Sequence, residues 1–360
     1  MTVRVGVVGG GLIAQAEHLP YLSSLRDRFT LTALAEPSRK VREALGARYG
    51  IADLHADYRS LLDAGLDAVV ICSPAGTHAE VVLAALDAGL HVFVEKPMCI
   101  TLADADAIVS ARDRTRNVVQ VGTMKRYDPA VEAMLESLPG SAADLRYVSV
   151  VVNDPEFAPF FEPGEIVRGG DIPPELIEAT RLQEAEQVAR AVGSDDEDVV
   201  RAFSESFLGS LLHDLNVVHG MLERLGEPLP AQVVCGDWWN EGRAVYGALR
   251  LRNGARVDAA WIQLLDTFEY RETIRFMFAD EVHSLEFPSP WLKQRPTIYR
   301  RSRADGRSDD VRIVQAYDES FSRELRHFHD CVVGGIPCRT PPEGARLDID
   351  VLTQMFLAAR

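Results

Sequence analysis

The sequence predicts an α/β fold in two domains: a doubly wound parallel sheet, then an α+β domain with a large, mostly antiparallel sheet. Over the first third, short β-branched runs alternate with helical stretches, which is typical of βαβ units. After about residue 230, strand-like runs follow one another directly. The 360 residues exceed a domain of about 150 residues. We therefore expect domains at 1–123 and 124–360.

The first domain repeats one pattern. Its strands read as nearly continuous apolar runs, as expected when helices cover both faces of a parallel sheet. Each crossover between neighbouring strands should be right-handed. The expected strands are 3–8, 30–35, 68–71, 92–94 and 118–121, and the expected helices are 12–25, 39–48, 78–88 and 102–114.

The pattern changes near residue 122. Asn253-Gly254 predicts a tight hairpin, because both turn positions need a positive φ. A Pro- and Gly-rich stretch over 155–174 resembles an insertion, and the 155–195 region is open to two interpretations, a lid or an oligomer contact. The expected helices are 129–138, 175–191, 199–225, 321–333 and 347–359, and the expected strands are 145–152, 232–239, 244–251, 256–265, 272–278 and 282–287.

Composition narrows the function classes. The formal charge of −16 disfavours nucleic-acid and anionic-membrane partners. No run of about 18 apolar residues predicts a membrane span. The N-terminus runs straight into a strand, so we expect no signal peptide. The five cysteines are scattered and form no CxxC pair, so we expect reduced thiols, a cytoplasmic location and no metal site.

A glycine-rich turn follows the first strand. Gly9-Gly10-Gly11-Leu12-Ile13-Ala14 fits G-x-G-x-x-A and opens a helix. Gly9 permits the tight turn, Gly11 lets the backbone approach a pyrophosphate, and Ala14 allows close helix–strand packing. The free N–H groups of the helix N-terminus then face the anion. This context predicts a dinucleotide-binding loop.

An acidic residue ends the second strand. Glu36 lies 22 residues after Ala14, near the spacing of about 20 expected for the acid that binds a ribose 2′-hydroxyl. A carboxylate there would repel a 2′-phosphate and favours NAD. Arg39 favours NADP instead, because an arginine can hold that phosphate. We expect NAD, with NADP as the alternative.

The segment His91-Val92-Phe93-Val94-Glu95-Lys96-Pro97 places a lysine at the C-terminal end of a buried parallel strand. Ligands of open α/β sheets bind beyond that edge. A lysine in a semi-dry cleft has a lowered pKa. Lys96 is therefore a candidate general acid/base that exchanges a proton with an alcohol or a ketone.

These motifs together resemble the Gfo/Idh/MocA oxidoreductases, which include glucose–fructose oxidoreductase and inositol dehydrogenases. The resemblance is carried by the glycine loop, Ser73-Pro74 with His78, Glu95-Lys96-Pro97, and the segment 122–129. It implies a Rossmann domain and a dehydrogenase or reductase of sugars, cyclitols or glycosides, active as a homodimer or homotetramer. The resemblance also implies a set of cofactor contacts: Gly9, Gly11, Leu12, Ile13, Glu36, Ser73, Pro74, His78, Glu95 and Lys96. Lys96 and Arg126 would also face the substrate.

The family pattern is incomplete on one helix. The resemblance implies a catalytic Asp followed four residues later by a His, and His213 fits the histidine. Gly209 stands where the Asp is expected. Asp214 is adjacent, but one residue turns about 100° on a helix, so it points elsewhere. We keep His213 as a second catalytic candidate, and His213 and Asp214 as substrate contacts.

Three functions stay open. The first is hydride transfer between nicotinamide and a secondary alcohol or ketone, with Lys96 as general acid/base. The second is tightly bound NAD used transiently in elimination or glycoside cleavage, for which the missing Asp leaves room. The third is a dinucleotide-binding regulatory protein without chemistry, which the intact Lys96 argues against.

Overall fold

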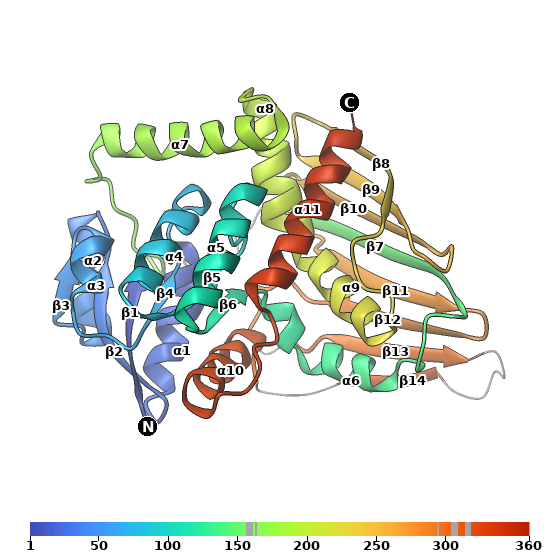
Figure 1. Ribbon diagram of the computed structural model, residues 1–360, viewed down its shortest axis with the longest axis horizontal. Helices are drawn as coiled ribbons and strands as arrows, with labels where there is room; N and C mark the ends of the chain where they lie inside the picture. Colours follow the sequence, from blue (N-terminus) through green and yellow to red (C-terminus); the bar gives the residue numbers. More distant parts are fainter. Residues whose placement is uncertain (156–160, 163, 294, 304–308, 314–317, 360) are drawn as a thin grey trace. The chain divides into compact units, whose positions relative to one another are not determined.

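The chain forms two compact units, which we call unit 1 and unit 2 (Figure 1). The computed structural model describes residues 1–155, 161–162, 164–293, 295–303, 309–313 and 318–359. Unit 1 consists of Met1–Gly122, Phe161–Arg190 and Phe321–Arg346, and unit 2 of Thr123–Phe160, Ala191–Ser320 and Leu347–Arg360. This division differs from the two continuous domains, 1–123 and 124–360, that the sequence predicts, because two later segments belong to unit 1.

Unit 1 holds a six-stranded parallel sheet with the order β3-β2-β1-β4-β5-β6, which confirms the doubly wound prediction. Its strands are β1 (Val3–Val8), β2 (Phe29–Ala35), β3 (Asp53–His55), β4 (Ala68–Ile71), β5 (His91–Glu95) and β6 (Val119–Gly122). Its helices include η1 (Ala14–His18), α1 (Leu19–Ser24), α2 (Arg39–Tyr49), α3 (Tyr58–Leu62), α4 (His78–Asp87) and α5 (Leu102–Thr115). Edge strand β3 and helix α3 escaped the sequence analysis, because both are short and polar.

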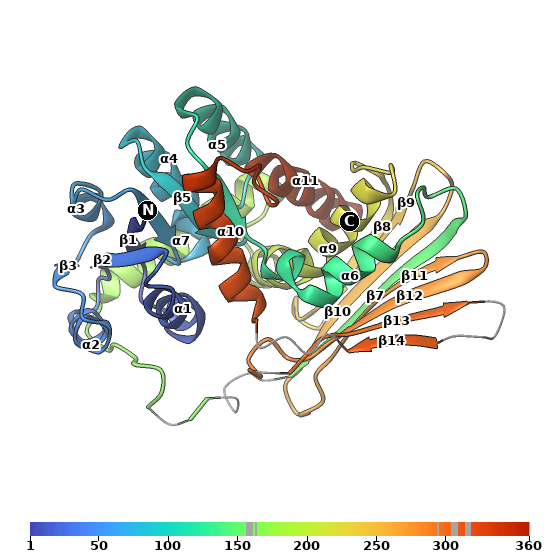
Figure 2. The same ribbon diagram turned by 90° about the horizontal axis from the view of Figure 1, so that it is seen from below.

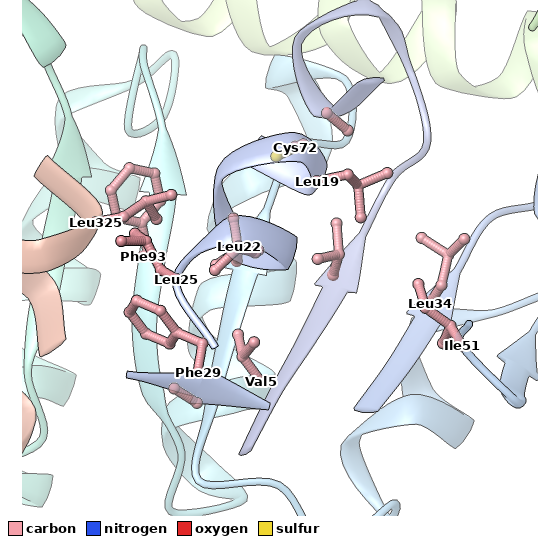
Figure 3. Packing of buried hydrophobic residues seen from close by; sticks show 14 of the residues in the cluster. Val5, Leu19, Leu22, Leu25, Phe29, Leu34, Ile51, Cys72, Phe93 and Leu325 are labelled. Atoms are coloured by element: carbon pink, nitrogen blue, oxygen red, sulfur yellow. The ribbon is translucent and has the colours of Figure 1, made fainter. Parts of the chain in front are cut away.

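The core of unit 1 explains why a C-terminal segment belongs to it. Val5 of β1 and Phe93 of β5 are fully buried, and α10 (Ser320–Gly334) adds Leu325 and Phe328 to the same cluster (Figure 3). The apolar face of α10 therefore completes the core that the strands begin. The sequence predicts this helix, but its periodicity does not say which sheet it covers.

The irregular stretch after β7 also contributes to unit 1. Val167 N–H donates to Oε1 of Gln15 at 2.8 Å, and Nε2 of Gln15 donates to Val167 O at 2.9 Å. Helix α7 (Pro174–Val192) follows, and its Gln187 donates to Gly76 O at 2.7 Å. Residues 156–160 and 163 of the predicted insertion lie outside the described residues. Within the described ranges, no helix has the length and apolarity that a membrane crossing needs.

Unit 2 holds an eight-stranded sheet with the order β14-β13-β12-β11-β7-β10-β9-β8 (Figure 2). β7 and β10 pair in parallel, and the other described pairings are antiparallel, which confirms the mostly antiparallel prediction. The Asn253-Gly254 turn joins β9 to β10 as expected, but only Gly254 has a positive φ, so the conformation expected for Asn253 is wrong. The strands are β7 (Leu145–Pro155), β8 (Gln232–Trp239), β9 (Ala244–Arg250), β10 (Arg256–Leu264), β11 (Arg271–Phe278), β12 (Glu281–Phe287), β13 (Ile298–Arg303) and β14 (Asp309–Ile313).

Helices cover one face of this sheet, but the expected single helix 199–225 is wrong. It divides into α8 (Glu197–Val200), a wider π-helical segment η5 (Arg201–Leu211) and α9 (Leu212–Arg224). Phe203 and Phe207 of η5 are fully buried and pack edge-on against Phe356 of α11 (Pro342–Ala358). A π-helical segment turns less per residue than an α-helix, so spacing rules for side chains change across it. Helix α6 (Pro129–Ser137) completes this layer.

Candidate functional site

The glycine loop between β1 and η1 has the shape that a dinucleotide needs. Gly9 has a φ of +96°, and a Cβ there would lie 2.6 Å from Cys72 O. A Cβ on Gly11 would meet nothing within 4 Å. Gly9 is therefore required by the fold itself, whereas Gly11 leaves the backbone open to an approaching ligand. Leu12 and Ile13 are half-buried at the start of the helix, and these residues fit a bound pyrophosphate.

Glu36 lies where the end of β2 meets this loop. Its carboxylate is buried, and its Oε2 accepts the N–H of Gly10 at 2.8 Å. Its Oε1 accepts the N–H of Ser38 at 2.8 Å. Each carboxylate oxygen keeps a further lone pair for a ribose hydroxyl. The placement of Glu36 fits the role that the sequence suggests.

Acidic side chains surround the turn after Glu36. The exposed Arg39 forms an ion pair with Glu43 at 2.6 Å along α2. Asp171 accepts the hydroxyl of Ser38 at 2.5 Å and the N–H of Lys40 at 3.0 Å. Asp171 comes from the irregular stretch, so sequence spacing gave no signal for it. Its charge makes this turn less favourable for a phosphate.

His78 joins the ends of β4 and β5. Its Nε2 lies 2.8 Å from Ser73 O and its Nδ1 lies 2.7 Å from Pro97 O. Burial lowers the pKa of His78, although the two carbonyls partly offset it. A neutral ring carries one N–H and donates to only one of these carbonyls at a time, so it binds either Ser73-Pro74 or Lys96-Pro97, the two segments that the resemblance implies for the cofactor. The hydroxyl of Ser73 bonds to Thr77 at 2.7 Å.

Lys96 directly follows β5 at the C-terminal edge of the sheet and is half-buried. This is the edge beyond which ligands of such sheets bind. Glu95 points the other way: its Oε1 lies 2.6 Å from Nε2 of the buried His18, and its Oε2 accepts the N–H of Lys96 at 3.1 Å. Glu95 therefore supports the strand end from inside unit 1, while the position of Lys96 matches the proposed acid/base.

A buried charged cluster forms in unit 2, which we call the Lys125 cluster: Lys125, Asp214, Tyr270 and Glu272. Nζ of Lys125 lies 2.5 Å from Oε1 of Glu272 and 3.6 Å from Oδ1 of Asp214. The hydroxyl of Tyr270 donates to the other oxygen of Glu272. All but Tyr270 have less than a tenth of their surface exposed.

Proton positions in the Lys125 cluster follow from its burial. Burial alone would lower the pKa of Lys125, but Asp214 and Glu272 raise it above its ordinary value. Burial and then the charge of Glu272 raise the pKa of Asp214 well above its usual range. Burial also raises the pKa of Tyr270. The cluster therefore favours a charged lysine and a protonated Asp214.

Arg126 does not join this cluster. Its guanidinium lies flat against Gly220 of α9, where a Cβ would come within 2.3 Å of Cζ. Its Nη1 donates to Asn216 O at 3.2 Å, and its Nη2 lies 3.5 Å from Glu223. The structure thus gives the predicted substrate contact Arg126 a packing position, and places its neighbour Lys125 at the centre of the charged cluster.

The histidine segment differs from the expected α-helix. His213 lies in the first turn of α9 and is half-buried, whereas Asp214 is 1% exposed and faces Lys125. Gly209 lies in π-helical η5, where a Cβ would be 3.0 Å from Ser204 O. The hydroxyl of Ser210 bonds to Glu205 O at 3.1 Å. Positions 209 and 213 therefore do not lie on one continuous α-helix, as the resemblance implies.

Sequence reasoning missed Lys125, Tyr270 and Glu272. Lys125 and Glu272 are 147 residues apart, and no pattern links residues at that separation. Tyr270 and Glu272 have the alternate spacing of one strand face, but many exposed pairs share it. The one usable signal is the cationic pair Lys125-Arg126, of which the resemblance implies only the second member.

Comparison with known proteins gives the same assignment for the N-terminal part. Residues 3–123 match the model of the GFO_IDH_MocA oxidoreductase family, described as an NAD-binding Rossmann fold. An inositol 2-dehydrogenase of Saccharopolyspora erythraea is 37% identical over 167 residues, which cover 45% of this chain and 49% of the relative. The match thus spans about half the length of that relative.

Two solved structures share the fold over nearly the whole chain. A UDP-N-acetylglucosamine 3-dehydrogenase from Acidithiobacillus ferrooxidans superposes with a TM-score of 0.73 at 18% identity, covering 99% of this chain and 98% of that one. A 3-ketoreductase from Actinomadura kijaniata in complex with NADP gives 0.74 at 17% identity, covering 100% and 98%. The likeness to the Gfo/Idh/MocA oxidoreductase family therefore rests on residues 3–123, which contain the open glycine loop, and the solved structures extend the shared fold to the rest of the chain.

Proposed function

We propose that the protein is an NAD(P)-dependent oxidoreductase that interconverts a secondary alcohol and a ketone of a sugar, cyclitol or glycoside. The observation that carries the proposal is the combination in unit 1 of an open Gly11 with a lysine at the C-terminal end of β5. The names of the relatives, inositol and sugar dehydrogenases and a ketoreductase, support the substrate class.

Lys96 is the proposed general acid/base. The bound nicotinamide supplies the hydride acceptor or donor of the reaction. In the oxidative direction the amine of Lys96 takes the proton of the substrate hydroxyl, and in the reductive direction the ammonium returns it. Glu95 and His78 are positioning residues: Glu95 binds the N–H of Lys96, and His78 binds Pro97 O.

NAD is the proposed cofactor, with NADP less favoured. The buried Glu36 and the exposed Asp171 both place negative charge near the turn that would receive a 2′-phosphate, and Glu43 pairs with Arg39. Each of these contacts should lower the affinity for the 2′-phosphate of NADP. NADP stays the alternative because a structural relative holds NADP, while the family model is described as NAD-binding.

In unit 2 we assign His213 the substrate contact and Asp214 a positioning role. Asp214 is 1% exposed and lies 3.6 Å from Nζ of Lys125, so a substrate hydroxyl does not reach it without opening this packing. The Lys125 cluster instead fixes the first turn of α9, from which the half-buried His213 extends.

The direct test is an activity screen with the full chain. Inositols, free sugars and glycosides are offered with NAD or NADP, and formation of the reduced nicotinamide is followed by absorbance. We expect turnover with at least one polyol and a higher kcat/KM with NAD. The proposal would be refuted if no alcohol led to formation of reduced nicotinamide and no matching ketone led to its consumption.

One observation favours a second function. Gly209 supplies no carboxylate where the resemblance implies one, and its Cβ position is closely approached by Ser204 O. Enzymes that oxidise a sugar only transiently, before elimination or glycoside cleavage, recycle their NAD. Dialysed protein that still holds dinucleotide and cleaves glycosides without added NAD would favour this function over net oxidation.

A further inference from the structure

Three ligand side chains meet in unit 1, none of which belongs to the glycine loop or to the segment of Lys96. They are His327, Cys331 and Cys338, and their candidate ligand atoms all lie within 4.8 Å of one another. Ligand atoms around a tetrahedral Zn²⁺ lie about 3.3–3.8 Å apart, given bonds of about 2.0–2.3 Å. The ligand atoms therefore need to approach one another by at most about 1.5 Å on coordination.

Helix α10 and a fixed loop bring the three side chains together. His327 and Cys331 are four residues apart on α10, so they share one helix face. His329 faces elsewhere, with its Nε2 3.0 Å from Met1 O. The sequence predicts no metal site because its cysteines are scattered and form no CxxC pair, a rule that does not detect a histidine and a cysteine four residues apart on one helix.

Cys338 reaches this face after the chain leaves α10. Gly335 turns the chain with a φ of +65°, and Thr340 then pairs with β6. The N–H of Val121 donates to Thr340 O at 2.9 Å, and the hydroxyl of Thr340 donates to Val121 O at 2.8 Å. The N–H of Arg339 donates to Nε2 of His327 at 3.0 Å. Helix α10 and the loop that carries Cys338 are therefore both held in place before any ion binds.

The chemistry of this set selects a soft cation. Two thiolates and a neutral imidazole are ligands that Zn²⁺ prefers, and the two thiolate charges neutralise the ion. Because Nε2 of His327 accepts the Arg339 N–H, it holds a lone pair and no proton. An ion that binds at Nε2 displaces the N–H of Arg339 from this lone pair. Both cysteines bind as thiolates, and any proton that a thiol carries before binding passes to the buffer.

An entry path exists. Cys331 is 2% exposed, but His327 and Cys338 are half-buried, and residues 333–337 beside them are exposed. We propose that His327, Cys331 and Cys338 form a binding site for Zn²⁺ or a similarly soft cation, with water in the fourth position. This site is separate from the proposed catalytic residues and stands whether or not the proposed function holds.

Zinc titration of the full, tag-free chain tests the site. The reduced and chelator-treated protein is titrated with Zn²⁺ against a chromophoric chelator, and with Co²⁺ to detect sulfur-to-metal charge-transfer bands. We expect about one equivalent of tight Zn²⁺. Removal of one ligand in C331S or C338S should weaken binding by more than about 10–100-fold, the loss expected from changes to supporting groups alone.

Cys235 on β8 of unit 2 provides the matched control, and C235S should bind Zn²⁺ as the wild type does. In a second readout, bound Zn²⁺ should protect Cys331 and Cys338 from alkylation, as mapped by mass spectrometry. Circular dichroism verifies that the variants fold without metal. Absence of tight Zn²⁺ in the wild type, or equal uptake by the C331S/C338S double variant, overturns the proposal.

Discussion

The glycine loop of unit 1 and the Lys125 cluster of unit 2 are built in opposite ways. The loop is one continuous segment, and its function depends on backbone shape: a positive φ at Gly9 and open space at Gly11. The Lys125 cluster joins residues up to 147 positions apart, and its function depends on charge pairing in a buried place. Backbone requirements leave a readable motif, whereas pairing across a fold does not.

The largest expected effect on stability comes from breaking the Lys125 cluster. K125M leaves Glu272 buried without its cation, so we expect the free energy of unfolding to fall by about 3–5 kcal/mol. The double variant K125M/E272Q removes the unpaired charge and should recover part of this loss. Denaturant unfolding measures both variants. A K125M protein as stable as the wild type would show that the cluster is not a paired network.

A second polar pair in unit 2 gives a pH-dependent effect. Burial alone would lower the pKa of His219, but Asp348, with Oδ1 2.8 Å from Nδ1, raises it from 6.5 to about 9. The folded state therefore binds the proton more tightly than the unfolded state. This pair contributes about 3 kcal/mol below pH 6.5, which is lost as pH rises through about 9.

Unfolding measured between pH 6 and about 10 checks this sign. D348N removes the charge that holds the proton, and its stability should depend less on pH over the same range. Wild type and D348N curves of equal slope would contradict the assigned charge of His219.

The smallest expected effect on stability comes from substitutions of Gly9 and Gly11, which should behave differently. G9A places a Cβ against Cys72 O at a positive φ and should cost about 1–3 kcal/mol. G11A meets no atom and should change stability by less than about 0.5 kcal/mol, yet weaken NADH binding. Thermal unfolding and NADH fluorescence titration measure the two properties. If G11A bound NADH as the wild type does, the loop would not be the pyrophosphate contact.

The sequence predicts much of the fold for a physical reason. β-branched runs and helical periodicity are local, so most strands of both sheets follow from them, although β3, β13 and β14 were not predicted. The π-helical segment η5 could not be predicted, because its widened turn satisfies the packing of Phe203 and Phe207 rather than a local preference. The membership of α10 in unit 1 likewise depends on distant partners such as Phe93.

The residues of the candidate site also fall into those that the sequence predicts and those that depend on distant partners. Gly9, Gly11, Glu36 and Lys96 lie where strand ends and motif spacing predict. The partners of Arg126 and Asp214 could not be predicted, because Glu223 and Glu272 lie close to them without any sequence spacing that connects the pairs. Asp171 was equally unpredictable, because an irregular segment brings it to the turn after β2.

The role of Lys96 is tested most directly by one paired measurement, turnover and NADH affinity in K96M, with the exposed Lys293 changed in K293M as the control. We predict that K96M lowers kcat/KM by about 10²–10⁴-fold, the usual contribution of a general acid/base. NADH affinity in K96M and both properties in K293M should stay near wild type. Near-normal turnover in K96M would contradict the account.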